Sequence, residues 1–308
     1  MEHYVTLFDA FFLPQGLALY RSLQRLNESF TLWVLCMDED VSKHLIELNL
    51  SHVRLLTLSE LETPELLQVK QGRSRAEYCW TLTPFTPAFV FQADAMVPRV
   101  TYVDADLWFL RSPQEIFAEF DASGKSVLIT EHAYHPPYDM SATSGKYCVQ
   151  FMTFVRGTSE PVRKWWEDQC IAWCYDRFEA GRFGDQKYLD DWLDRFPESV
   201  HVLQNRGWAR APWNVLRFLE KDAIFYHFHG LRLGTLGIMR GSYPIPRSFL
   251  KTIYDPYAQD ISWALQRMVA LGLPAPIQAP ITRYVRQSLG RLRRLILNRA
   301  DLWRDSSC

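Results

Sequence analysis

Short apolar runs alternate with helical patterns along the first part of the chain. HYVTLF at 3–8, FTLWVLCM at 30–37 and VRLLTL at 53–58 are rich in β-branched, leucine and aromatic residues, as expected of buried strands. Residues 16–26 and 41–50, which separate them, have the spacing of helices. This alternation predicts a parallel sheet flanked by helices, the α/β class.

The pattern continues toward the carboxyl half. Further strands are predicted at 100–103, KSVLIT (125–130), KYCVQFMTFV (146–155) and AIFYHFHG (223–230). A helix is predicted from Ser159 to Arg177, and its tryptophans recur at helical spacing, which favours a core role. A second, short helix is predicted within DQKYLDDWLDRF.

The character of the chain changes past Tyr254. ISWALQRMVALG predicts an amphipathic helix, ended by Gly272 and a proline-rich linker. We therefore expect one main domain over 1–255 and a helical extension over 256–308. Residues 281–304 hold seven arginines and one acid, a balance of +6, so the remainder carries −7 of the net −1.

The arginine-rich segment 281–304 interleaves cations with apolar residues at three- and four-residue spacing. On a helix this gives an apolar stripe flanked by arginines, the pattern of a helix lying in an anionic membrane interface. The alternative is a helix that packs on its own acidic domain or on a partner subunit. Membrane contact would place the protein in the cytoplasm, peripheral on the inner face of the membrane.

Composition narrows the function. Charged residues make up 22% of the 308 residues with a net charge of −1, which excludes nucleic acid as the main partner. No uninterrupted apolar run approaches the ~18 residues of a spanning helix, and the acidic start MEHYVTLF is unlike a signal peptide. The six cysteines contain no CxxC pair, which suits free thiols in a reducing compartment.

The strongest chemical signal is TYVDADLWFL, where an apolar strand ends on Asp104 and Asp106. Open α/β sheets place ligands at the carboxyl ends of their strands. Alternation along an extended chain would turn both carboxylates to one side, where they could share Mn²⁺ or Mg²⁺. His227 or His229, at the end of a late strand, could complete the shell, because imidazole is acceptable to Mn²⁺.

These segments together resemble the glycogenin-like retaining glycosyltransferases, glycosyltransferase family eight and its near relatives, over roughly residues 4–235. The matching segments, in chain order, are YVTLFDAF, CWTLTPF, TYVDADLWFL, FGDQKYLDDW, APWN and HFHG. The resemblance implies a GT-A fold, a divalent metal and a nucleotide-sugar donor, with UDP as the favoured nucleotide. The implied metal ligands are Asp104, Asp106 and His227, because the family's histidine stands three residues before a glycine and Gly230 fixes that offset.

The resemblance also assigns donor contacts. Leu7, Asp9 and Phe11 match the segment that frames the base, with Phe11 stacking on uracil. Asp185 and Gln186 match the catalytic pair that faces the anomeric carbon. The implied reaction is sugar transfer to a hydroxyl with retention of configuration. A lipid-linked glycan or lipopolysaccharide acceptor would fit the arginine-rich segment and a role in cell-envelope polysaccharide synthesis.

Departures from the family pattern affect the donor site. The expected cations for the diphosphate are Arg75, just before CWTLTPF, and Arg232, where the family has a lysine. Asp104 is also expected to face the diphosphate, across the metal. Cys148-Val149-Gln150 replaces an Asn-x-Gly that lines the donor sugar in the family. Gln150 is therefore expected in the sugar pocket, and the identity of the donor sugar cannot be inferred from the family.

Two other functions share parts of this pattern. A sugar nucleotidyltransferase would have an α/β layout and metal carboxylates, but it usually has a glycine-rich basic loop where this chain reads FDAFFLPQG. A non-catalytic nucleotide-sugar-binding protein on a degenerate fold is the other alternative. The complete set of Asp104, Asp106, Asp185 and His227 favours an enzyme over both.

Overall fold

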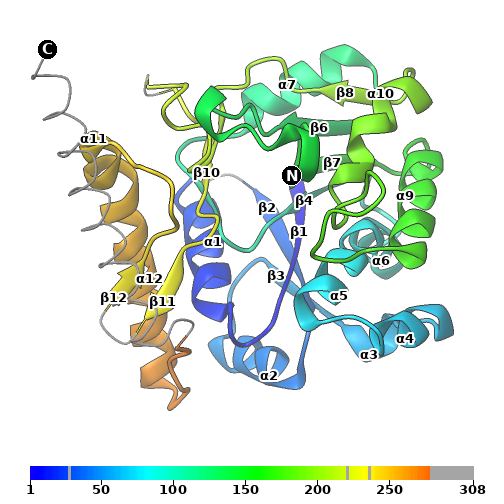
Figure 1. Ribbon diagram of the computed structural model, residues 1–308. Helices are drawn as coiled ribbons and strands as arrows, with labels where there is room; N and C mark the ends of the chain where they lie inside the picture. Colours follow the sequence, from blue (N-terminus) through cyan, green and yellow to red (C-terminus); the bar gives the residue numbers. More distant parts are fainter. Residues whose placement is uncertain (27–28, 220–221, 235–236, 278–308) are drawn as a thin grey trace, which may run out of the picture. The chain divides into compact units, whose positions relative to one another are not determined.

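The computed structural model describes residues 1–26, 29–219, 222–234 and 237–277. A seven-stranded sheet with the order β3-β2-β1-β4-β7-β6-β8 lies at its centre. Figure 1 shows helices α1 and α12 on one side of this sheet and α5, α6 and α9 on the other. The predicted α/β class is confirmed.

The strands of the three sheets are short, and most were expected at these places. Their bounds are β1 (Glu2–Phe8), β2 (Phe30–Cys36), β3 (Val53–Thr57), β4 (Arg99–Val103), β5 (Leu107–Phe109), β6 (Val127–Glu131), β7 (Tyr147–Val155), β8 (Val200–Val202), β9 (Ala209–Arg210), β10 (Phe225–His227), β11 (Arg232–Gly234) and β12 (Gly237–Met239).

Most helices lie between consecutive strands. The α-helices are α1 (Leu13–Arg25), α2 (Glu39–Leu48), α3 (Leu58–Leu61), α4 (Pro64–Lys70), α5 (Arg75–Leu82), α6 (Thr86–Ala93), α7 (Gln114–Ser123), α8 (Ser141–Ser144), α9 (Glu160–Ala172), α10 (Trp192–Arg195), α11 (Arg247–Phe249) and α12 (Asp255–Ala270). The 3₁₀ turns are η1 (Thr83–Phe85), η2 (Pro136–Tyr138) and η3 (Lys187–Asp191), and η4 (Leu250–Tyr254) is a π-helical turn.

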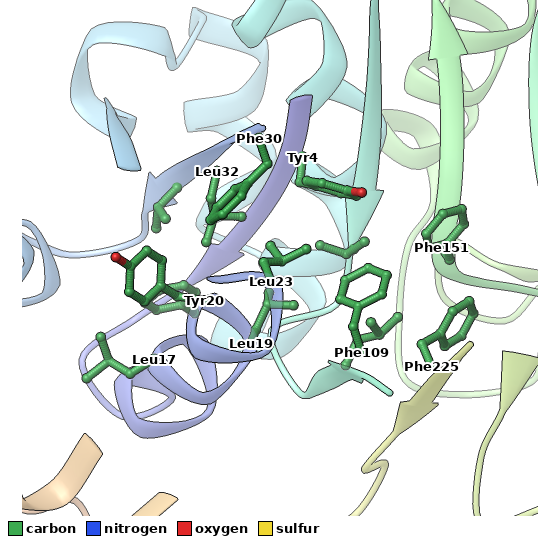
Figure 2. Packing of buried hydrophobic residues seen from close by; sticks show 14 of the residues in the cluster. Tyr4, Leu17, Leu19, Tyr20, Leu23, Phe30, Leu32, Phe109, Phe151 and Phe225 are labelled. Atoms are coloured by element: carbon green, nitrogen blue, oxygen red, sulfur yellow. The ribbon is translucent and has the colours of Figure 1, made fainter. Parts of the chain in front are cut away.

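The central strands are buried on both faces, as the continuous apolar runs predict. On β1, Tyr4 and Phe8 join the core under α1, whereas Val5 and Leu7 join the core under α5 and α6. Period-two alternation of side chains divides the strand in this way. Figure 2 shows the α1 side of this core, where Tyr4 packs edge-on against Phe109 at a ring distance of 5.7 Å.

One strand departs from the expected parallel sheet. β7 runs antiparallel between β4 and β6, and pairs Val103 with Phe151. Period-two patterns report that a strand is buried but not its direction. The reversed direction of β7 brings Gln150 beside the end of β4, where Asp104 lies.

Two predicted helices have different bounds. α9 ends at Ala172 rather than near Arg177, because Trp173 takes an extended backbone (φ −160°, ψ 123°). Trp166 and Trp173 are buried, in agreement with a core role for the tryptophans. The segment after Gln186 is a 3₁₀ turn, η3, followed by the single-turn helix α10.

Helix α12 packs on α1 through a buried carboxylate. Asp260 is 3% exposed and pairs with Arg21 (Nε–Oδ1 3.1 Å) and Arg25 of α1. It also accepts a hydrogen bond from Trp108 Nε1 at 2.8 Å. The boundary predicted after residue 255 remains a proposal. Helix α12, which follows it, is joined to α1 through the arginines and to β5 through Trp108.

We expect Asp260→Ala to lower the free energy of unfolding by about 2 kcal/mol. The substitution leaves the buried Trp108 N–H without an acceptor, which costs ~1–3 kcal/mol, and the half-exposed arginines add little. Urea denaturation measures the change. The exposed neighbour Gln259→Ala is the control, and an equal loss in both variants would contradict the anchoring role of Asp260.

A second compact unit contains Gly230–Ser242 and, of the remaining described residues, 275–277. Its β11 and β12 form an antiparallel hairpin that pairs Leu233 with Ile238. The predicted amphipathic helix over 281–304 lies outside the described residues. Among the described residues, no helix is both long enough and apolar enough to cross a membrane.

Candidate metal and donor site

The two aspartates of the DxD motif lie in the tight turn between β4 and β5. The Asp104 main-chain N–H donates to the carbonyl of Gln150 (3.1 Å), and the Leu107 N–H returns to the carbonyl of Asp104 (3.0 Å). The two carboxylates therefore converge through a turn, not through alternation along an extended strand as expected. The turn allows β5 to pair with the late strand β10.

His227 reaches the aspartates because β10 pairs antiparallel with β5 and places it opposite Leu107. Its Nε2 lies 3.0 Å from Asp106 Oδ1 and 3.5 Å from Asp104 Oδ2. The Phe228 N–H donates to the carbonyl of Asp106 (2.9 Å) and fixes this register. Ligand atoms of all three residues lie within 4.8 Å of one another, so the structure brings the predicted trio together.

The donor set fits a divalent cation such as Mn²⁺ or Mg²⁺, because it offers two carboxylates and one imidazole in a largely buried position. Burial alone would lower the pKa of His227, but Asp106, Asp104 and a contact with Cys148 outweigh it and raise that pKa well above its ordinary value. The field that holds a proton on His227 is the field that would hold a cation.

Asp104 has a fixed position. Tyr102 OH donates to its Oδ1 at 2.9 Å. Burial raises the pKa of Asp104, and the neighbouring Asp106 carboxylate adds to this effect while His227 opposes it. Two close carboxylates repel each other, and nearby positive charge relieves the repulsion; here the protonated His227 supplies that charge, and a bound cation could take its place.

Asp185 lies near this cluster, and its side chain is 4% exposed. Burial raises its pKa to about 7, and the charge of Asp104 adds to the shift. Within the described part of the chain, its Oδ2 has no hydrogen-bond partner. Its main-chain carbonyl accepts a bond from Trp166 Nε1 (2.8 Å), which holds the segment in place. A buried carboxyl group with an unused oxygen beside a metal site is typical of a functional position.

The other member of the predicted catalytic pair is anchored differently. Gln186 is half-buried and its Nε2 donates to the carbonyl of Ser144 at 2.8 Å. The following Lys187 donates to the carbonyl of Ser141 (2.9 Å) and pairs with Asp190 (2.7 Å). The DQ segment is therefore joined to the loop around α8. Whether Gln186 meets a sugar stays a prediction.

The predicted base-binding residues Leu7, Asp9 and Phe11 lie at the carboxyl end of β1. Asp9 accepts a hydrogen bond from the Phe12 N–H (3.0 Å) and pairs with Arg75 Nε (2.6 Å). Arg75 also contacts Asp38, the N-cap of α2. Leu7 is buried in the core, and Phe11, just before α1, is 41% exposed.

Two predicted donor contacts have other surroundings in the structure. Gln150 is fully buried, and its Oε1 lies 2.9 Å from His227 Nδ1, although it was expected to line the sugar pocket. Arg232 lies on the β11–β12 hairpin of the second unit and contacts its own chain at Leu231. Both donor-binding roles stay predictions.

Sequence reasoning missed several residues of this site. Asp38 follows β2, and a polar residue at a strand's carboxyl end was a usable signal. Trp213 lies in the APWN segment of the resemblance but was given no role; its ring lies 5.3 Å from His227 and 5.2 Å from His132. His132 is buried, and burial lowers its pKa to about 3, so it is neutral.

Comparisons with known proteins place the chain in a family. No family model matches it. Two uncharacterized proteins of Bacillus subtilis (strain 168) do: YfnF is 28% identical over 287 residues, covering 87% of this chain and 94% of YfnF. YfnD is 31% identical over 252 residues, covering 76% of this chain and 79% of YfnD.

Solved structures establish the fold. The galactosyltransferase LgtC, in complex with donor and acceptor sugar analogues, matches with a TM-score of 0.54 and 12% identity, covering 85% of this chain and 95% of LgtC. Mouse xyloside xylosyltransferase 1, apo form, matches with a TM-score of 0.51 and 18% identity, covering 80% and 99%. The predicted GT-A fold is confirmed, and the chain belongs to the same family as Bacillus subtilis YfnD.

Proposed function

We propose that the protein is a metal-dependent glycosyltransferase that moves a sugar from a nucleoside-diphosphate donor to a hydroxyl acceptor. The observation that carries the proposal is the convergence of Asp104, Asp106 and His227 on one point, beside the buried Asp185. The proteins that share its fold include a galactosyltransferase and a xylosyltransferase, which supports this reaction class.

The chain's own residues divide the work of such a reaction. Asp104, Asp106 and His227 would hold a divalent ion, which would offset the charge that develops on the leaving diphosphate. Asp185 lies close enough to feel the charge of Asp104 and would face the anomeric carbon. In its ionised form it would stabilise positive charge that develops on the sugar ring during transfer.

The proposed nucleotide is UDP. The base would lie at the ends of β1 and β2, where Asp9, Asp38 and Arg75 form a linked polar cluster. An aromatic ring at the rim, such as that of Phe11, offers a stacking surface for a base. Arg75 pairs with both carboxylates of this cluster, which places it at the proposed base site.

The acceptor would enter a cavity of ≈ 410 Å³ at the end of β6. Its lining combines an aromatic ring with charged groups, namely Tyr134 with Glu131, Lys146, Asp190 and Arg217. Tyr134 stacks on His132 at 4.7 Å, and the ring of Trp213 connects His132 to His227. Aromatic rings suit the apolar C–H face of a sugar, and paired polar groups suit its hydroxyl groups. A lipid-linked glycan, with 281–304 on an anionic membrane, remains our proposed acceptor class.

A thermal-shift panel of nucleotides tests the donor assignment. UDP with Mn²⁺, at about 100 times its Kd, should stabilise the fold by ~2.7 kcal/mol, a rise in melting temperature of about 4 °C for a chain of this length. The shift should be smaller for GDP and should largely disappear in EDTA. Equal shifts with and without Mn²⁺ would argue against the metal, and a larger shift with GDP would argue against uridine.

A further inference from the structure

Gln150 joins two parts of the proposed metal site from within the core. Its side chain is fully buried, and its Oε1 lies 2.9 Å from Nδ1 of His227. Its main-chain carbonyl accepts the N–H of Asp104 at 3.1 Å. One residue of β7 therefore contacts both a carboxylate ligand's backbone and the ring of the imidazole ligand.

The orientation of the Gln150 amide follows from its other end. Its Nε2 donates to Thr130 Oγ1 at 3.5 Å, and Thr130 Oγ1 in turn donates to the main-chain carbonyl of Cys148 at 3.5 Å. A carbonyl can only accept, so the chain of donors runs from Gln150 through Thr130 to Cys148. This direction leaves Oε1, an acceptor, facing His227.

We propose, on the basis of the function proposed above, that Gln150 is a positioning residue that keeps the proton of His227 on Nδ1 and turns Nε2 toward Asp104 and Asp106. An imidazole whose Nδ1–H donates to an acceptor presents the lone pair of Nε2 to a metal. The Nε2 atom is the one that lies 3.0 Å from Asp106 Oδ1.

The arrangement requires an acceptor-bearing side chain at position 150. Gln150 reaches His227 Nδ1 with its Oε1, whereas a glycine at this position would have no side chain to accept the bond.

Metal affinity provides the first test. Gln150→Met keeps the length of the side chain but removes the acceptor, and should weaken Mn²⁺ binding, measured by electron paramagnetic resonance, on the order of 10- to 100-fold. Gln150→Glu retains an acceptor and should bind within about threefold of wild type. Met152→Leu on the same buried strand is the matched control and should bind unchanged. Equal losses in Met and Glu variants would overturn the proposal, because a packing role does not depend on the acceptor.

A metal-free readout separates this proposal from the metal site itself. In ¹⁵N-histidine-labelled apoprotein, His227 should show a slowly exchanging Nδ1–H resonance, identified by its loss in His227→Ala. Gln150→Met should shift that resonance and speed its exchange. If it is unaffected, the positioning role is wrong even where Mn²⁺ binds. If wild type shows the bonded Nδ1–H but binds no Mn²⁺, the proposed function fails instead.

Discussion

Asp104→Asn should reduce sugar transfer by on the order of 1,000-fold while the protein stays folded. The substitution keeps the shape of the side chain and its bond from Tyr102, but removes one of the two charges that would hold the cation. Loss of a group that stabilises charge in the transition state typically costs 100- to 1,000-fold in rate. Release of UDP from UDP-sugars, with Mn²⁺ present, measures the change.

The same assay contains its own controls. EDTA should abolish turnover of the wild type, and added Mn²⁺ should restore it, whereas Asp104→Asn should not recover at moderate Mn²⁺. Asp194→Asn, an exposed aspartate on α10, should behave as wild type. Full activity of the wild type in EDTA, or of Asp104→Asn, would contradict a metal mechanism at this site.

The three residues of the proposed metal site could be predicted from the sequence because each of them stands in a recognisable local sequence pattern. Asp104 and Asp106 follow an apolar run, and His227 stands at a set offset before Gly230. The β5–β10 pairing that brings them within 4.8 Å was not predicted, since three-residue strands carry too little pattern. Motif matching therefore identified the residues, and the structure supplies the geometry that joins them.

Long-range polar contacts are the part that could not be predicted. Asp260 reaches Arg25 across 235 residues, and Arg75 reaches Asp38 across 37. Such pairs depend on how helices settle on the sheet, which periodicity does not encode. The same limitation explains Gln150, whose partner His227 lies 77 residues away and comes near only because β7 runs antiparallel.

The environment of Asp185 has a consequence for stability as well as for catalysis. Its pKa rises from 3.8 to about 7 on folding, because the carboxyl group is buried near Asp104. Between about pH 4 and pH 7 the folded protein therefore holds a proton that the unfolded chain releases. The contribution of Asp185 to stability is most favourable below pH 4, declines as the pH rises, and is most unfavourable above pH 7.

Asp185→Asn should therefore stabilise the metal-free protein at pH 8 and progressively less toward pH 4. The full shift corresponds to about 4 kcal/mol as an upper bound, since each pH unit is worth ~1.4 kcal/mol. Urea denaturation of both proteins at several pH values gives the difference between them, so that other titrating groups cancel. The variant should lose sugar transfer as it gains stability, as expected where a functional site holds an unfavourable charge.

The exposed neighbour Asp191→Asn provides the matched control, with a difference from wild type that stays near zero at every pH. A divalent cation should reduce the advantage of Asp185→Asn, because nearby positive charge favours the carboxylate that the variant lacks. If the advantage of Asp185→Asn is the same at pH 5 and pH 8, Asp185 does not titrate in this range. The burial beside Asp104 would then not be the source of its chemistry, and its role on the sugar face would have to be reassigned to Gln186.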